Sequence, residues 1–222
     1  SSICRFQIDS TSHVGRESPG GRCPGGHAAD NVRYGAAAAK AAHKALAGYP
    51  RDSSSLGILR NGDLRRGDPG SAWARYASAL PELLNTSAPP QIDAMNLSGA
   101  IDLALVLQEA GEHDRATALL AGSEQVIRGI PRLGLLGYGI ADAQIHALRG
   151  NKSKALAALR EAERAGWRGP TWLYYRDVDL NLASIRDEPE FKAVFADIER
   201  DMARQRAELA KRPKDAPLNL GP

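Results

Sequence analysis

The stretch GDPGSAWARYASAL at residues 67–80 is repeated in outline by GEHDRATALLAGSE at residues 111–124 and by GNKSKALAALREAE at residues 150–163. Each stretch begins with a glycine and continues with strong helix formers. The fifth residue after the glycine is always alanine, the ninth is Tyr or Leu, and the twelfth is small. These positions hold Ala72, Ala116 and Ala155, then Tyr76, Leu120 and Leu159, then Ala79, Ser123 and Ala162. The shared pattern predicts three equivalent helices.

A fourth helix of the same type is predicted upstream. The segment AAAAKAAHKALAGYP at residues 36–50 places Ala38 and Ala45 34 residues before Ala72 and Ala79. Small side chains let two helix backbones approach closely, and the large residue one turn further fills the groove between helix pairs. From residue 31 onward the sequence is typical of a string of helices, which predicts an all-α fold of antiparallel helix pairs.

The repeated pattern resembles the second helix of the tetratricopeptide repeat (TPR), a family in which helix pairs of about 34 residues stack into a superhelix. In the predicted first helices, Leu103, Ala104 and Leu107 stand at the family's Leu, small and Tyr positions, and Ala143 stands at the next small position. Two features depart from the family: successive glycines are 44 and 39 residues apart, and the family's Trp is absent from the first helices. The resemblance implies a right-handed α-solenoid of about three and a half helix pairs.

The region from about residue 165 to residue 212, called the closing segment below, resembles the region after the repeats in a group of bacterial TPR proteins. The shared features are a Gly-Trp pair, an aromatic cluster and a D-x-x-L-x-x-L-R-D-x-P-x-F run. They correspond here to Gly166, Trp167, Trp172, Tyr174, Tyr175, Asp179, Leu182, Ile185, Arg186, Asp187, Pro189 and Phe191. In that group such regions end larger signalling proteins that begin with a winged-helix or nucleotide cyclase domain. The resemblance implies a sensory or interaction region without the output domain.

The last predicted helix can also be derived from its own residues. Asp187 is expected to cap it, with Glu188 and Pro189 in the first turn. An apolar stripe at three- and four-residue spacing follows, formed by Phe191, Val194, Phe195, Ile198 and Met202. Such a helix, apolar on one side and charged on the other, is what the open end of a helix stack requires. We therefore expect a C-terminal capping helix.

Residues 1–30 are rich in Ser, Gly and Pro and lack apolar periodicity, so they are expected to be a flexible tail or linker that precedes a helical domain at residues 31–222. The chain begins at Ser1 and its methionines are Met95 and Met202, which suggests a processed product or part of a longer protein. Cys4 and Cys23 both lie in this stretch and cannot form a disulfide framework.

Charge and hydropathy exclude several classes of partner. The 222 residues include 29 Lys and Arg against 26 Asp and Glu, and these charges alternate along the chain, so no nucleic-acid surface is predicted. No stretch is apolar enough to span a membrane. A soluble chain is expected, on the cytoplasmic or periplasmic side of a bacterial cell.

The sequence offers no catalytic or cofactor motif. It contains no nucleophile elbow, phosphate-binding loop or dinucleotide glycine fingerprint, and its five histidines show no metal-ligand spacing. His146 is expected to be a packed core residue and not a ligand. Trp172, Tyr174 and Tyr175 could stack on a ligand or form a small satellite core. We therefore expect no enzyme activity, no cofactor and no metal site.

Binding is the remaining function. In TPR domains the concave face, built by the first helices, binds the ligand, and one subtype holds a peptide carboxylate with Lys, Asn and Arg. Asn61 matches the first Asn of that clamp and Arg65 lies one turn further on, whereas Gly57 and Asp102 occupy other clamp positions. The candidate binding residues on this face are Asn61, Arg65, Ile101, Leu105, Gln108, Gln144 and Leu148. Packing of Leu105 and Leu148 on adjacent helices is an equally good interpretation.

The sequence thus predicts a non-catalytic scaffold that binds a peptide, a helix or a neighbouring domain on its concave face. The partner could be the upstream domain of the same polypeptide. The alternative is that the chain is the regulatory C-terminal part of a bacterial nucleotide cyclase or winged-helix transcriptional regulator.

Overall fold

The computed structural model describes residues 27–85, 89–130, 138–169 and 171–212. All regular secondary structure in these ranges is helical, which confirms the predicted all-α class. The helices are α1 (His27–Gly48), α2 (Ser53–Arg65), α3 (Pro69–Ala79), η1 (Pro81–Leu83), α4 (Leu97–Glu109), α5 (His113–Gly129), α6 (Tyr138–Leu148), α7 (Lys152–Arg164), α8 (Trp172–Asp177), η3 (Leu180–Ile185) and α9 (Pro189–Ala210), where η marks a 3-10 helix.

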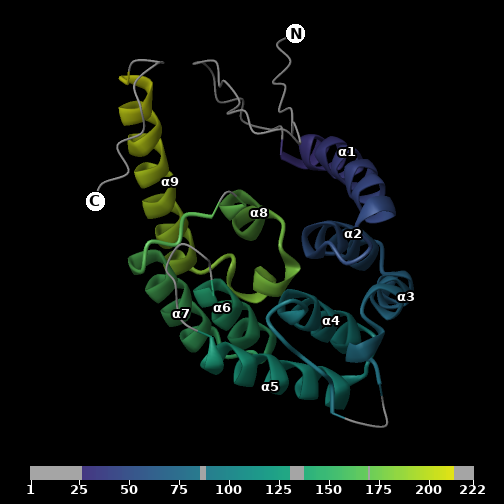
Figure 1. Cartoon of the computed structure of the whole chain (residues 1–222). Coiled ribbons are helices and arrows are strands. Elements are labelled where there is room, and N and C mark those ends of the chain that lie inside the picture. Colours follow the sequence, from purple (N-terminus) through teal and green to yellow (C-terminus); the bar gives the residue numbers. More distant parts are fainter. Residues whose placement is uncertain (1–26, 86–88, 131–137, 170, 213–222) are drawn as a thin grey trace.

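The helices from α1 to α7 follow one another around an arc (Figure 1). The helices α4 and α5 pack against each other, as do α6 and α7, and in each pair a short turn joins the two. The chain then turns inward, so that α8 lies on the inner side of the arc and η3 packs against α6 and α7. Finally α9 packs on α7 and extends beyond it.

Three turns between helices share one geometry. Gly67, Gly111 and Gly150 have φ of 72°, 82° and 72°, in the left-handed region that glycine adopts without steric cost. The residue after each glycine donates its N–H to a carbonyl five positions earlier, the hydrogen bond that ends a helix in the Schellman motif. A fourth glycine, Gly166, ends α7 in the same way. The predicted turn positions are therefore confirmed.

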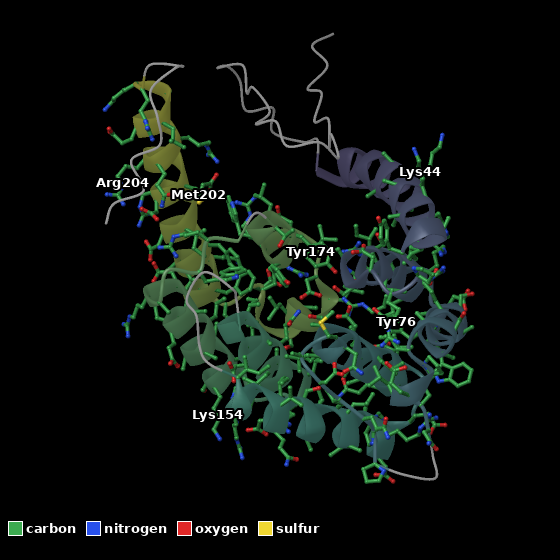
Figure 2. All side chains as sticks on the ribbon, viewed as in Figure 1. Lys44, Tyr76, Lys154, Tyr174, Met202 and Arg204 are labelled. Atoms are coloured by element: carbon green, nitrogen blue, oxygen red, sulfur yellow. The ribbon has the colours of Figure 1, made fainter. Side chains whose placement is uncertain are left out.

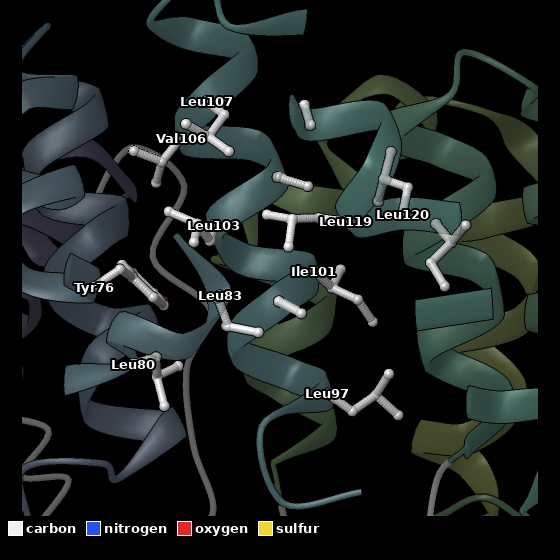
Figure 3. Packing of buried hydrophobic residues seen from close by; sticks show 14 of the residues in the cluster. Tyr76, Leu80, Leu83, Leu97, Ile101, Leu103, Val106, Leu107, Leu119 and Leu120 are labelled. Carbon is white, nitrogen blue, oxygen red and sulfur yellow. The ribbon is translucent and has the colours of Figure 1, made fainter. Parts of the chain in front are cut away.

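The residues that repeat in sequence also repeat in burial. Ala72, Ala116 and Ala155 are each fully buried, as are the large residues one turn later in the same helices. A first apolar cluster fills the space between α2, α3, α4 and α5 and reaches Ile145 on α6 (Figure 3). A second cluster joins α6 and α7 to the closing segment. No buried residue belongs to both clusters.

The last helix agrees with prediction in its apolar stripe but not in its cap. Phe191, Val194, Phe195 and Ile198 are all buried in the second cluster. The prediction that Asp187 caps α9 is wrong, because Glu188 occupies the N-cap position with an extended backbone and makes no side-chain cap hydrogen bond. Pro189 causes this shift, since proline favours the first helical position and forces the residue before it to be extended.

The N-terminal boundary also differs from the expected one. The first helix begins at His27, so residues 27–30, expected in the tail, belong to α1. Residues 1–26, which include Cys4 and Cys23, lie outside the described residues. Within the described part of the chain, no helix combines the length and the apolar character needed to cross a membrane.

Candidate functional site: the inner face of the helix array

The inner side of the arc carries a segment of the chain itself. Residues 172–186, which contain α8 and η3 and are called the crossing segment below, lie against α2, α4 and α6. We call the surface that these three helices turn toward the crossing segment the inner face. Three of the seven residues that the sequence predicts for a binding face, Asn61, Arg65 and Gln144, lie on it.

Arg60 on α2 stands at the centre of this contact. Its side chain has no solvent exposure, yet its guanidinium forms ion pairs with Asp102 of α4 and with Asp179 of the crossing segment. Nη2 lies 2.9 Å from Asp179 Oδ1, and Nη1 donates to Asn181 Oδ1 over 2.9 Å. A fourth acceptor is Asn61 Oδ1, which receives bonds from Nε and Nη2 at 3.1 and 2.8 Å. A buried guanidinium is tolerated only when its donors are satisfied in this way.

The two carboxylates that face Arg60 are themselves held by neutral donors. Tyr76 on α3 donates its hydroxyl to Asp102 Oδ2 over 2.9 Å, and Asn181 Nδ2 donates to Asp102 Oδ1 over 2.7 Å. Gln144 on α6 donates to Asp179 Oδ2 over 2.6 Å. Each carboxylate therefore combines an ion pair with hydrogen bonds from neighbouring elements.

A second group of bonds reaches the backbone of the crossing segment. The carbonyl oxygen of Val178 accepts from Asn61 Nδ2 at 3.2 Å and from Arg65 Nη2 at 2.9 Å. The hydroxyl of Tyr174 also accepts from Asn61 Nδ2, at 3.0 Å. Tyr174 belongs to α8 and Tyr76 to α3, and Figure 2 shows both rings in their places around the inner side of the arc.

Electrostatics of the network follow from one cation facing two carboxylates. Burial raises the pKa of Asp102 and outweighs the opposing effect of Arg60, while Asp179 adds repulsion. Burial alone would lower the pKa of Arg60, but Asp102 and Asp179 are among the groups that raise it, so the guanidinium stays charged. Burial also raises the pKa of Tyr76 and of Tyr174. Both phenols are therefore neutral at physiological pH and serve as hydrogen-bonding groups.

The structure brings three of the predicted binding residues onto the crossing segment. Asn61, Arg65 and Gln144 all donate side-chain hydrogen bonds to it. Gln108 instead donates to the carbonyl of Leu148 at 3.0 Å, so it ties α4 to α6. The apolar candidates serve packing.

Those apolar candidates are Ile101, Leu105 and Leu148. Ile101 is buried in the first apolar cluster, Leu148 packs against that cluster from its edge, and Leu105 is buried. The interpretation that Leu105 and Leu148 pack on adjacent helices therefore fits their environment.

The two departures from the peptide-carboxylate clamp have a structural reason. A Cβ at Gly57 would come within 3.0 Å of the Tyr174 hydroxyl and 3.2 Å of Asp102 Oδ2, so glycine leaves room for the crossing segment. Asp102, at the other position, pairs with Arg60. The inner face therefore accommodates the crossing segment beside Gly57, and its own carboxylate, Asp102, is paired with Arg60.

Sequence reasoning missed the centre of the network. It did not select Arg60, Asp179 or Asn181 as functional residues. One signal was available: Asp102 interrupts the apolar run LSGAIDLALVLQ, and a carboxylate in a buried helix requires a partner. The partner itself was not readable, because Arg60 and Asp179 are 119 residues apart.

The aromatic residues of the closing segment form a packed group. Trp167 and Trp172 are buried in the second cluster, and Tyr175 packs edge-on against Trp167 with ring centroids 5.5 Å apart. Arg176 lies 5.0 Å from the ring centroid of Trp172. The sequence left open whether these aromatic residues stack on a ligand or form a small satellite core, and the packing of Trp167, Trp172 and Tyr175 fits the satellite core.

His146, expected to be a packed core residue, is half-buried on α6.

The chemistry open to this site is recognition. In the described ranges no three His, Cys, Asp or Glu side chains gather as a metal site would require. The unpaired buried side-chain atoms found in the same ranges, Arg75 Nε and Ser123 Oγ, lie outside the network. Comparison of the chain with protein-family models, with curated proteins and with solved structures finds no match. Function must therefore be argued from the site.

Proposed function

We propose that this chain is a non-catalytic protein-interaction module with a TPR-like, right-handed α-solenoid architecture, closed at its C-terminus by α9. Two observations support the architecture. The same left-handed glycine ends α2, α4 and α6, and the helix after each of them buries an alanine at the same position. Equivalent turns and equivalent small residues are what stacked helix pairs require.

The observation that carries the proposed function is that the inner face already binds a stretch of polypeptide. Asn61 and Arg65 donate to a backbone carbonyl, and Gln144 donates to a carboxylate, from two different helices. Carbonyls are common to all peptides, whereas the carboxylate contact selects an acidic residue. The partner is therefore a peptide, a helix or a neighbouring domain with an acidic segment.

Affinity capture from a lysate of the native cells tests this function. The bait is the chain itself, compared with an Arg65→Ala, Gln144→Ala double variant and with Arg128→Ala, whose side chain is exposed on α5 and pairs with Glu124. We expect a defined protein that the chain and Arg128→Ala both retain and that the double variant loses. Retention of the same proteins by all three baits would contradict binding on the inner face.

A second candidate function has support from α1. This helix packs on α2, and alanines on its remaining surface, among them Ala36, Ala37 and Ala41, are exposed. Small exposed side chains allow another helix to approach closely. This favours a regulatory region joined to further domains, such as those of a nucleotide cyclase or winged-helix regulator. The reading frame upstream of Ser1 decides the matter, since either output domain would be recognisable there.

A further inference from the structure

The crossing segment is attached in two chemically different ways. Toward α6, α7 and α9 it contributes Trp172, Leu182 and Ile185 to the second apolar cluster. Toward α2 and α4 it makes hydrogen bonds and ion pairs, and it contributes no buried side chain to the first cluster. A polar seam therefore separates the crossing segment from the first half of the arc.

A polar seam can open at lower cost than an apolar one. Separation there exposes donors and acceptors that water can satisfy. The same separation frees Arg60, Asn61 and Arg65, the donors that hold Val178 and Asp179 in the closed form, from these two residues. Opening therefore makes a set of donors with fixed spacing on α2 available to another peptide.

We propose that the crossing segment is an exchangeable occupant of the inner face, and that the partner is an acidic peptide segment which replaces it. The replacing segment presents a backbone carbonyl, then a carboxylate, then an amide or similar group two residues later, as Val178, Asp179 and Asn181 do. The proposal rests on the proposed function, because it assumes that the inner face receives a partner. It adds the chemistry of that partner and the regulation of the site.

The crossing segment competes with an external peptide for the inner face, and this competition sets the apparent affinity of the peptide. A tethered occupant acts at an effective concentration of roughly millimolar order, so an external peptide binds only the open fraction of molecules. A change that weakens the tethered contact and leaves the inner face intact must therefore strengthen binding in trans. A change in the inner face itself must weaken it. These opposite signs distinguish exchange from a purely structural contact.

The test uses the full chain and a fluorescein-labelled peptide of residues 172–186, with binding measured by fluorescence anisotropy. Asp179→Asn removes the charge that faces Arg60, and Tyr174→Phe removes the acceptor for Asn61. Ser184→Ala is the matched control, since Ser184 lies in the same segment but donates to Ala147 of α6. We expect Asp179→Asn to bind the peptide about tenfold more tightly than the unmodified chain, Tyr174→Phe about two- to tenfold, and Ser184→Ala equally.

One further protein variant and one variant peptide test whether the peptide binds on the inner face. Adding Gln144→Ala to Asp179→Asn should abolish the gain, because Gln144 donates to the peptide's aspartate. A peptide with asparagine in place of that aspartate should bind about tenfold more weakly. Circular dichroism and thermal melting establish that each variant is folded, and Tyr174→Phe, which removes one hydroxyl, keeps the test decisive if Asp179→Asn unfolds.

The failure of this proposal can be distinguished from the failure of the proposed function. If Asp179→Asn and Tyr174→Phe bind the peptide no better than the unmodified chain, the crossing segment is not exchangeable. The lysate capture then decides the function independently, since loss of a partner in the Arg65→Ala, Gln144→Ala double variant would still support the interaction module. Hydrogen exchange of the amides of residues 178–185 gives a second readout: exchange only at the rate of global unfolding would overturn the proposal.

Discussion

At the scale of single residues, Arg60 dominates the energetics of the inner face. The fully buried guanidinium of Arg60 neutralises the carboxylates of Asp102 and Asp179. Its removal would leave two buried carboxylates without a cationic partner. We expect Arg60→Met to lower the free energy of unfolding by about 3–5 kcal/mol, measured by urea denaturation.

Arg65→Ala is the matched control for this prediction, because Arg65 is on the same helix and is bonded to the same segment from an exposed position. Its loss should change stability by less than about 1 kcal/mol. Equal losses for the two arginines would show that the buried ion pairs do not stabilise the fold as described.

The raised pKa of Asp102 predicts a pH dependence. Between its ordinary value of 3.8 and the raised value, the folded chain binds more protons at this site than the unfolded chain, so stability falls as pH rises through that window. Asp102→Asn lacks this contribution. We therefore expect the unfolding free energy of the unmodified chain, minus that of Asp102→Asn, to decrease as the pH rises above 3.8.

The control is Glu109→Gln, an exposed carboxylate at the end of the same helix. Arg60 and Asp179, the other charges that face Asp102, remain in both chains, so the comparison isolates one carboxyl group. An identical pH profile for Asp102→Asn and the unmodified chain would contradict the assigned direction of the shift.

At the scale of helices, close approach depends on small residues at fixed positions. Ala155 on α7 is fully buried, and a Cβ added at Gly139 on α6 would come within 2.6 Å of Ala162 Cβ. We expect Ala155→Leu to destabilise the chain by about 1–3 kcal/mol through overpacking, measured by thermal melting. Ala157→Leu, two residues away on an exposed position, should have little effect. If both variants melt alike, the assignment of packing positions is wrong.

The elements differ in how far the sequence predicts them. The helices after Gly67, Gly111 and Gly150 were predictable, since glycine turns and small-residue spacing are encoded within about a dozen residues. Asn61, Arg65 and Gln144, which the helix pattern predicts on one face, all donate hydrogen bonds to the crossing segment. The route of the crossing segment was not predictable, because its contacts join residues more than 100 positions apart, as with Arg60 and Asp179. The cap of α9 lies at Glu188 and not at the predicted Asp187, because Pro189 keeps the residue before it extended.

At the scale of the whole molecule, the two apolar clusters predict two units of local stability. Phe195 is buried in the second cluster beside Phe191, with ring centroids 4.7 Å apart, and has no place in the first. We expect Phe195→Ala to cost about 3–5 kcal/mol and to accelerate hydrogen exchange in α7 and α9 more than in α4. Uniform acceleration across the chain would show that the clusters unfold as one unit.

The distance in sequence between Arg60 and Asp179 has a consequence for synthesis of the chain. A ribosome that adds roughly 5–20 residues per second needs about 6–24 s to cover the 119 residues between them. During that time α2 has emerged with a guanidinium that lacks one of its two carboxylate partners. Any product that terminates early keeps this defect permanently, so completion of the inner face marks a chain that has been translated through its closing segment.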